Sequence, residues 1–533
     1  MISSGQVFCG EWSNLSNEMS EQPVTTSKKL VHNTVFNVAA LVSNAIIGFF
    51  MIRFLLGRLG EVRYGVWLLI GGSIIRYGPM LSMGLNSSIN RYIPVYRARS
   101  DADGVQRVIS TSLFFFTILG IVLAVVSLVV HFNVGSWFAI KPELVQTAGI
   151  LVLVVGFCLA LAMPFQPYTA ILSGLQRYDL INLMTLGVLL LRTLLVVIFL
   201  LRGRGLLTVG IVFGVSEIAV RAFHSIFVLR LLPAVSLSLA KIDLKLLKEM
   251  LAYGINTFLY ALGAMIIHYA STLIIGIFIG TAQISQFAVA AAGVLLLSHL
   301  LEAFTAAIKP AVSDLDARND QRTVKEIALL TQKYSLLLII PGGFFFVVMG
   351  REFLWIFFGD RFEDPAVIDG MAVILAILCV GHCLRLAQHS NFLVLVGRGQ
   401  HRILGILAAS AALLCVSASV VAVKVFDLGL LGIAWANLVS MVLISGVVLP
   451  IYFNRKMRIS VSENMREVWR PAILGSLPVV AMIGVWKYLA PPDSWPQIVG
   501  VVIAAMALTL IGGWFLSLKE VERKRFTRIA LRR

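Results

Sequence analysis

Apolar runs of about 20 residues follow one another along most of the chain. An α-helix needs about 20 apolar residues to cross the hydrocarbon core of a bilayer. In hydrocarbon, backbone N–H and C=O groups must be paired inside the protein, so only helices and closed β-barrels can span it. Barrel strands would be alternating segments of about ten residues, much shorter than these runs. The sequence therefore predicts an all-α polytopic membrane protein.

The composition agrees with this prediction. Of the 533 residues, 59% are hydrophobic and 13% are charged, whereas soluble domains have about 45–50% apolar and about 25% charged residues. A net charge of +17 can indicate a nucleic-acid partner, but here the Lys and Arg lie in short segments between apolar runs. This placement predicts contact with membrane lipids and no nucleic-acid partner.

The apolar runs predict about fourteen transmembrane helices. They cover residues 33–55, 65–90, 109–130, 147–172, 182–201, 206–228, 250–279, 285–308, 334–358, 367–396, 403–423, 429–453, 471–489 and 498–518.

An internal repeat divides these spans into two sets. The segment YIPVY (92–96) closes the second span, KPAV (309–312) closes the eighth, and a charged stretch follows each. The six-span interval predicts two six-helix lobes related by a pseudo-two-fold axis along the membrane normal, plus two C-terminal helices. The predicted divisions are a polar N-terminal segment 1–32, an N-lobe 33–230, a linker 231–249, a C-lobe 250–453, an extension 454–518 and a basic tail 519–533.

Most of the 44 Lys and Arg residues fall in the two termini and the even-numbered loops. Cytoplasmic loops of membrane proteins carry an excess of Lys and Arg. Both termini and the charged loops 91–107, 230–248, 309–333 and 455–470 are therefore predicted to be cytoplasmic.

Several charged side chains lie inside the predicted spans, where each costs at least about 2.5 kcal/mol unless it is compensated. Arg76 and Arg385 lie near mid-span with no carboxylate within a turn on the same helix. We expect them to face each other's lobe across a water-filled cavity and to bind an anion, because guanidinium groups match phosphate oxygens in bidentate fashion. The candidate substrate-binding residues are Arg76, Arg385, Arg192, Arg221 and Asn86.

Other polar groups in the spans are candidates for ion coupling. These are Glu217, Glu302, His382 and His389. Histidine changes its charge near pH 6.5, which makes a proton-linked switch available. The alternative is that these side chains only bond neighbouring helices, as the i, i+4 pair of Glu217 and Arg221 can do.

The sequence does not predict a cofactor. Cys379 and Cys383 lie one turn apart with His382 between them, which could form a soft-metal site. Buried thiols that simply pack in a membrane helix are the better interpretation, so no metal is predicted. The chain has no Walker A sequence, HExxH motif or nucleophile elbow, so we expect a transporter driven by a gradient and not an enzyme.

Four segments carry a family resemblance. They are 55–67 (LLGRLGEVRYGVW), 81–92 (LSMGLNSSINRY), 171–179 (ILSGLQRYD) and 310–315 (PAVSDL). In order and spacing the chain, from about Asn33 to Phe453, resembles the polysaccharide flippases of the multidrug/oligosaccharidyl-lipid/polysaccharide exporter superfamily.

This resemblance implies a flippase of the bacterial inner membrane. Such proteins move polyprenyl-diphosphate-linked oligosaccharides from the cytoplasmic to the periplasmic leaflet by alternating access, through a cationic cavity between two lobes. The implied partners are the lipid-linked oligosaccharide, membrane lipids and other polysaccharide assembly proteins.

Three alternatives to the flippase remain. A multidrug/cation antiporter of the same superfamily is expected to have acidic rather than arginine-rich spans. A membrane glycosyltransferase or polymerase needs a placed acid or base, but the longest exterior loop, 131–146, has Glu143 as its one acidic residue. A non-transporting scaffold leaves the charges in the spans unexplained.

Overall fold

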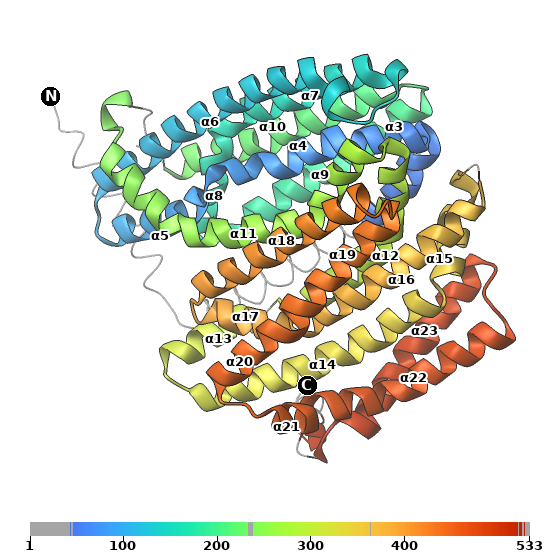
Figure 1. The fold of residues 1–533 in the computed structure, drawn as a ribbon. Helices are drawn as coiled ribbons and strands as arrows, with labels where there is room; N and C mark the ends of the chain where they lie inside the picture. The colour runs from blue at the N-terminus through green and yellow to red at the C-terminus, as the bar shows by residue number, and fades with distance from the viewer. Residues whose placement is uncertain are drawn as a thin grey trace.

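Long helices that run side by side build the molecule (Figure 1). The structure is a computed structural model that describes residues 43, 46–232, 238–306, 308–362, 364–520, 522–524 and 527. In these ranges no strand is present. Among the described residues eleven helices are long and apolar enough to cross a membrane, and the number is 13 if each of two bent helix pairs counts as one span. Most of the first predicted span, 33–55, lies outside the described residues.

The helices form two groups, with α3–α10 in the upper part of Figure 1 and α12–α23 in the lower part. The upper group follows a helix at 46–59 and comprises α3 (Glu61–Val66), α4 (Ser73–Tyr77), α5 (Leu85–Ala98), α6 (Ala102–Trp137), α7 (Pro142–Ala162), α8 (Gln166–Gly174), α9 (Tyr178–Leu201) and α10 (Leu206–Leu231). We call this group the N-lobe.

Helix α11 (Leu244–Phe278) runs between the two groups and packs along α18. The lower group, the C-lobe, comprises α12 (Thr281–Thr305), α13 (Ile308–Ala317), α14 (Gln321–Val348), α15 (Gly350–Phe358), α16 (Ala366–Ala387), α17 (His389–Gly397), α18 (His401–Lys424), α19 (Gly429–Met441) and α20 (Leu449–Met457). The extension follows with α21 (Val461–Asn464), α22 (Arg470–Leu489) and α23 (Trp495–Gly512). We group the described tail residues 519–520 and 522–524 with it.

Two predicted continuous spans are bent in the structure. The second span bends by 47° between Ser82 and Leu85, and the seventh bends by 50° between Ile255 and Thr257. In the tenth, a turn at Gln388 separates α16 from α17, although the two together form one membrane-length segment. At the first bend Gly84 has φ 79°, which glycine adopts without the Cβ strain of other residues. Apolar composition continues across both bends, so hydropathy alone did not reveal them.

The charged loops predicted at 91–107, 309–333 and 455–470 are largely helical. Helix α5 extends to Ala98 and α6 begins at Ala102. The side chain of Asp101 accepts the N–H of Gly104, and that of Asp320 accepts the N–H of Thr323, so each caps the next helix. These caps supply acceptors for unpaired backbone N–H groups at the helix ends, so the helices can continue past the apolar runs into charged segments.

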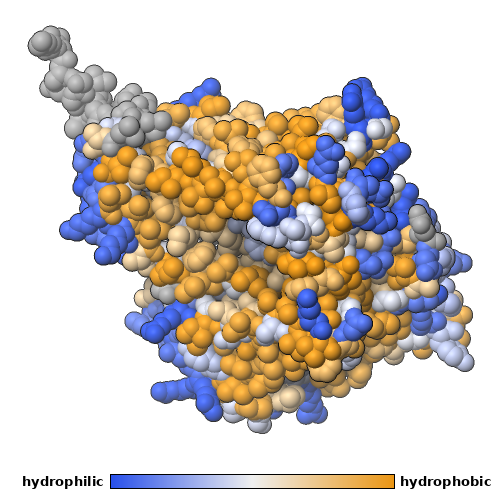
Figure 2. Space-filling view, turned by 45° about the horizontal axis from the view of Figure 1, so that its top comes forward, coloured by the Kyte–Doolittle hydropathy of each residue, from blue (hydrophilic) through white to orange (hydrophobic). Residues whose placement is uncertain are grey.

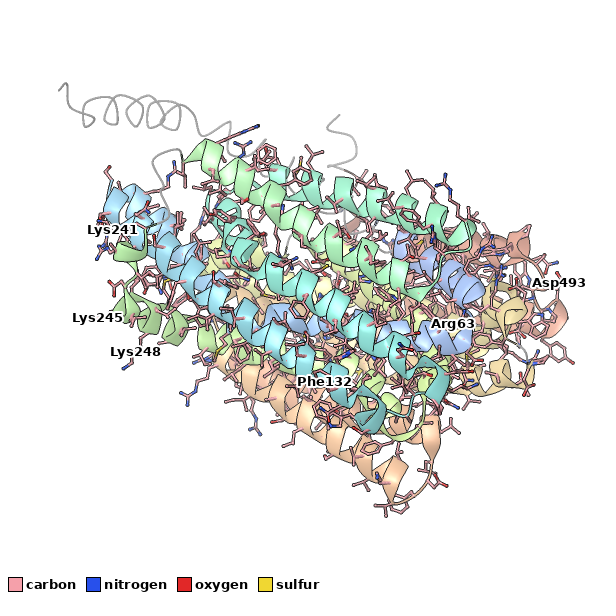
Figure 3. All side chains as sticks on the ribbon, turned by 90° about the horizontal axis from the view of Figure 1, so that it is seen from above. Arg63, Phe132, Lys241, Lys245, Lys248 and Asp493 are labelled. Atoms are coloured by element: carbon pink, nitrogen blue, oxygen red, sulfur yellow. The ribbon has the colours of Figure 1, made fainter. Side chains whose placement is uncertain are left out.

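The two ends of the helix bundle differ in charge. Figure 3 labels Lys241, Lys245 and Lys248 at one end, which we call the lysine end, and Arg63 and Asp493 at the other, the Arg63 end. Between the ends the surface is broadly apolar (Figure 2), and Phe132 is 78% exposed. An apolar belt between two charged ends identifies a multi-pass membrane protein.

The lobes share one hydrophobic core at the Arg63 end and have separate cores at the lysine end. Val66 and Trp67 of the N-lobe belong to the same buried cluster as Ile284 and Phe353 of the C-lobe. At the lysine end one cluster belongs to the N-lobe and α11, and the other to the C-lobe. The first includes Leu85, Ile89, Val105, Leu246 and Met250, and the second includes Val312, Val324, Val394 and Phe453.

Two further contacts fix this arrangement. At the Arg63 end the Ser285 hydroxyl donates to the Glu61 carbonyl at 2.6 Å, which joins α12 to α3. Near the lysine end a Cβ on Gly84 would lie 2.2 Å from the carbonyl oxygen of Gly254, so α5 and α11 cross in direct backbone contact. The start of α11 is therefore held against the N-lobe, and its continuation lies with the C-lobe.

The extension is attached to α14 by a buried ion pair. The Lys333 ammonium, whose side chain is 2% exposed, lies 2.7 and 2.8 Å from the two carboxylate oxygens of Glu522. A chain of amides adds to this attachment, because Asn464 donates to Gln332 at 3.2 Å and Gln332 donates to the Ala387 carbonyl at 3.3 Å. The extension is thus linked to the end of α16 through Gln332 of α14.

Candidate functional site

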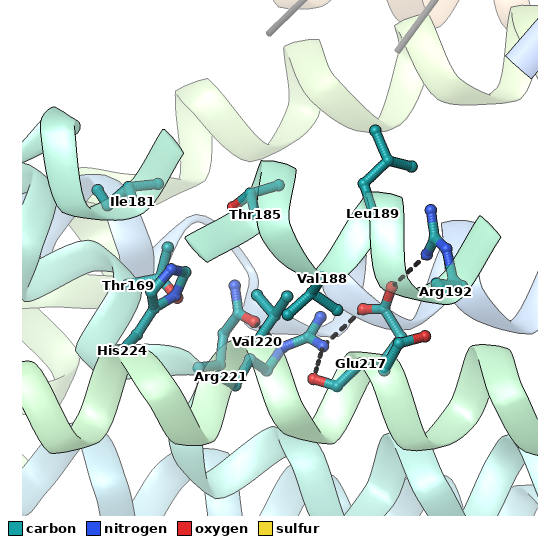
Figure 4. Close-up of a pocket in the computed structure, with 12 residues that line it drawn as sticks. Thr169, Ile181, Thr185, Val188, Leu189, Arg192, Glu217, Val220, Arg221 and His224 are labelled. Carbon is teal, nitrogen blue, oxygen red and sulfur yellow. Dashed lines mark hydrogen bonds and ion pairs between the residues drawn. The ribbon is translucent and has the colours of Figure 1, made fainter. Parts of the chain in front are cut away.

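Two arginines share one carboxylate inside the N-lobe (Figure 4). Arg221 Nη1 lies 2.6 Å from Glu217 Oε2 on the same helix, and Arg192 Nη1 approaches Glu217 Oε1 at 3.6 Å from α9. The sequence offered Arg192 no partner on its own helix, and the packing of α9 on α10 supplies one. Two guanidinium groups and one carboxylate leave a formal charge of +1, which compensates for burial only in part.

These side chains line a pocket of about 270 Å³ between α8, α9 and α10. Arg221 Nε donates to the side-chain oxygen of Gln166 at 2.6 Å, and Thr169 Oγ1 lies 2.8 Å from His224 Nδ1. Gln166 and Thr169 were not among the predicted site residues. Their signal is two polar side chains between Pro164 and the end of a span, which is weak without the fold.

Three polar side chains on one face of α10 explain why the pocket forms there. Glu217, Arg221 and His224 follow at i, i+4 and i+7, so all three face the same side of the helix. The Arg192 guanidinium also lies 4.4 Å from the Phe213 ring centroid, a cation–π contact that holds it against α10.

A second cluster lies in the C-lobe, where α12 meets the break between α16 and α17. His299 Nδ1 is 3.5 Å from Glu302 Oε2, and Glu302 interacts electrostatically with Arg385 and His389. The structure therefore brings together three of the predicted residues, Glu302, Arg385 and His389, from separate helices. Their proximity depends on the α12–α16 packing and could not be read from the spacing along either helix.

Aromatic rings border this second cluster. Tyr260 of α11 stacks on Phe392 at 5.0 Å between ring centroids, and His389 stacks on Phe392 at 6.1 Å. Tyr260 also interacts electrostatically with Arg385.

Arg385 keeps hydrogen-bonding capacity that the described residues do not use. Its Nε and Nη2 atoms are buried from solvent, and no acceptor among the described residues meets them. A buried guanidinium donor without an acceptor is costly unless water or an anion satisfies it. Arg385 is therefore the group in the C-lobe best prepared to receive an anionic ligand.

Arg76 and Asn86 lie on the broken second span. The Arg76 guanidinium is exposed and sits 4.6 Å from the ring centroid of Tyr269 in α11. The side-chain oxygen of Asn86 is buried and has no hydrogen-bond donor among the described residues. Arg76 thus contacts the helix that joins the lobes, while its predicted position opposite Arg385 stays a prediction.

The cysteine motif does not form a metal centre in the described part of the chain. Cys379 Sγ lies 3.8 Å from Cys383 Sγ and 3.5 Å from the Gly343 carbonyl. No group of three His, Cys, Asp or Glu side chains there could hold a metal ion. His382 lies one turn before Arg385 on α16 and is half-buried.

Comparison with protein families gives one match. A family model described as "Polysaccharide biosynthesis protein" matches residues 80–367, more than half of the chain. A comparison with curated protein sequences finds no match.

Solved structures of transporters share the fold. An inward closed structure of the lipid II flippase MurJ has a TM-score of 0.70 and 15% identity, covering 93% of this chain and 100% of that one. An inward-facing multidrug resistance MATE transporter of the MOP superfamily has a TM-score of 0.63 and 16% identity, with coverage of 80% and 94%. An outward-facing structure described in the same words has a TM-score of 0.58 at 17% identity, with coverage of 81% and 96%.

Proposed function

Since the chain belongs to the polysaccharide biosynthesis protein family, we propose that it is a flippase for polyprenyl-diphosphate-linked oligosaccharides. It moves this substrate from the cytoplasmic to the extracytoplasmic leaflet of the bacterial cytoplasmic membrane during surface polysaccharide synthesis. The lysine end, which includes Lys241, Lys245 and Lys248, is the cytoplasmic end, because Lys and Arg concentrate on the cytoplasmic side.

The observation that carries this proposal is the buried, unsatisfied guanidinium of Arg385. A substrate diphosphate would supply the acceptors that Nε and Nη2 lack. Arg76, Arg192 and Arg221 add positive charge, against the carboxylates Glu217 and Glu302. This excess of arginine favours an anionic substrate over the cationic drugs that an antiporter would carry.

Alternating access follows from the two-lobe core. The lobes are fused by a common core at the Arg63 end and separated at the lysine end, the arrangement expected when a central cavity opens to the cytoplasm. Transport then requires the core at the Arg63 end to part while the ends near Leu246 and Val312 approach each other.

Substitution of the two central arginines tests the proposal. Arg76→Ala and Arg385→Ala should each abolish polysaccharide export. Each variant removes charge-assisted hydrogen bonds to the substrate diphosphate, which contribute about 1.5–3 kcal/mol each. Arg→Lys at the same positions should restore export in part, since lysine keeps the charge but loses the fork geometry. The matched control is Arg202→Ala, at an exposed arginine directly after α9, which should export normally.

The measurements are cell-surface polysaccharide and the amount of the protein in the membrane. Loss of export at normal membrane abundance supports substrate binding. Normal export by both alanine variants, or the disappearance of both from the membrane, would assign the arginines a structural role and reject the site.

A further inference from the structure

A second arginine pocket lies at the Arg63 end, far along the molecule from the lysines. It has a volume of about 320 Å³ and is lined by Arg53, Phe54, Gly57, Arg58 and Arg361. Four of these residues belong to the helix at 46–59, which ends shortly before Arg63. The fifth, Arg361, follows α15, so the pocket lies between the helix at 46–59 and the C-lobe.

The pocket has more positive charge than its one paired carboxylate neutralises. Asp360 Oδ2 lies 3.0 Å from Arg53 Nη2 and 3.2 Å from Arg361 Nε. Arg58 is exposed and forms no ion pair with any described residue. Among the described residues at the pocket, three guanidinium groups and one carboxylate leave a formal charge of +2.

The arginines are held in place by backbone contacts. Arg53 donates to the carbonyls of Ile356, at 3.4 Å, and of Phe357, which end α15. A Cβ at Gly57 would lie 2.8 Å from Arg361 Nη1, so the absence of a side chain there lets the Arg361 guanidinium lie against the helix. Arg53 and Arg361 are thus fixed around Asp360, and Arg58 is left to take a ligand.

The location makes the charge unexpected for a purely topological role. Lys and Arg are depleted from the extracytoplasmic side of membrane proteins because positive residues there oppose the preferred insertion. Three arginines that converge on one pocket at that end therefore indicate a ligand. Guanidinium groups that offer paired N–H donors are best matched by phosphate oxygens.

We propose that this pocket, formed by Arg53, Arg58 and Arg361, binds a phosphate-bearing headgroup at the extracytoplasmic face. Because the pocket joins the helix at 46–59 to the segment after α15, a bound phosphate holds that helix against the C-lobe at this end. Two membrane molecules carry the required chemistry, namely the diphosphate of a lipid-linked saccharide and an anionic phospholipid. The pocket is separate from the cluster around Arg385, and its place at the extracytoplasmic face rests on the orientation proposed with the flippase function.

Binding to the purified full-length protein in detergent tests this inference. Inorganic pyrophosphate is titrated calorimetrically into the wild type, Arg58→Gln, Arg361→Gln and Arg63→Gln. Arg58→Gln should weaken one class of sites at least about tenfold, the loss expected for a charge-assisted hydrogen bond. Arg63 is also exposed but lies outside the pocket, so Arg63→Gln should bind within about twofold of wild type.

A second arm identifies the source of the phosphate. Native mass spectrometry counts phosphatidylglycerol and phosphatidylcholine molecules retained by each variant. Loss of retained phosphatidylglycerol in Arg58→Gln assigns the pocket to a phospholipid headgroup, and loss of pyrophosphate binding alone assigns it to the diphosphate of the saccharide carrier.

The outcome that overturns the inference is equal binding of both probes by Arg58→Gln, Arg361→Gln and the wild type. Arg385→Gln separates this result from a failure of the proposed function. If pyrophosphate binding depends on Arg385 and not on Arg58, the central site stands and the extracytoplasmic pocket is rejected. Arg58 has no ion-pair partner to lose among the described residues, so its replacement leaves folding intact, which thermal unfolding of the same samples checks.

Discussion

The buried ion pair between Lys333 and Glu522 makes the attachment of the extension measurable. Glu522→Gln leaves the Lys333 ammonium, whose side chain is 2% exposed, without a counter-charge. Lys333→Met instead leaves the Glu522 carboxylate, whose side chain is 14% exposed, without its lysine. That carboxylate also keeps the N–H of Lys519 as a donor at 2.9 Å. Removing one partner of a buried pair costs about 3–5 kcal/mol. We therefore expect a loss in this range for Glu522→Gln and a smaller loss for Lys333→Met.

The double variant should recover most of the loss. With Lys333→Met and Glu522→Gln together, no buried charge remains, and replacing a whole buried pair is often neutral or stabilising. The coupling energy between the two sites should therefore be at least about 2 kcal/mol. Unfolding can be followed in detergent titrated with SDS, using a thiol-reactive dye that reports exposure of the buried Cys379 and Cys415.

An exposed ion pair on the same segment provides the control. Lys519 contacts Glu467, and their side chains are 55% and 23% exposed. Lys519→Met should cost no more than about 1 kcal/mol, as exposed pairs do. If Glu522→Gln is as stable as the wild type, or if the double variant loses the sum of the two single losses, the pair is not a coupled buried contact.

Three further predictions concern topology, helix crossing and coupling. In a background without native cysteines, single cysteines at the predicted cytoplasmic positions Lys28, Ala102 and Thr527 should be protected from impermeant thiol reagents in intact cells. A cysteine at Glu143 should react, and labelling at Ala102 from outside would reverse the predicted orientation. Gly84→Ala should destabilise the protein by about 1–3 kcal/mol in SDS titration, because its Cβ would overlap Gly254 at a positive φ, whereas Gly187→Ala, which meets open space, should not destabilise it. If transport is coupled to an ion through the candidate residues, its rate in vesicles should respond to a pH or sodium gradient. Indifference to both gradients would reject this role for Glu217, Glu302, His382 and His389.

The sequence was sufficient for the fold class and for the charges that share a helix. Apolar run length predicted the helices, and the i, i+4 spacing predicted the contact of Glu217 with Arg221, which the structure places at 2.6 Å. The count of fourteen spans is not reproduced in the described residues, because the first span is mostly outside them and two others are bent. The residue bounds of the lobes stay predictions.

Partners on different helices were beyond the sequence. The approach of Arg192 to Glu217 depends on how α9 packs on α10, and that of Arg385 to Glu302 on how α12 meets α16. Hydropathy carries no information about these inter-helix distances. The pair of Lys333 and Glu522 joins residues 189 positions apart, and nothing local to either residue signals it.

The position of α11 has a consequence for how the protein is made. Leu246 and Met250, from the start of α11, complete the hydrophobic cluster that contains Leu85, Ile89 and Val105. When α10 has been synthesised, this cluster still lacks the side chains of Leu246 and Met250. The hydrophobic core of the nascent N-lobe is therefore incomplete at the lysine end. The first turns of α11 fill it, and the same helix then starts the second half of the bundle. We therefore expect the two halves to assemble in sequence, and a fragment that ends at Leu232 to lack part of its hydrophobic core.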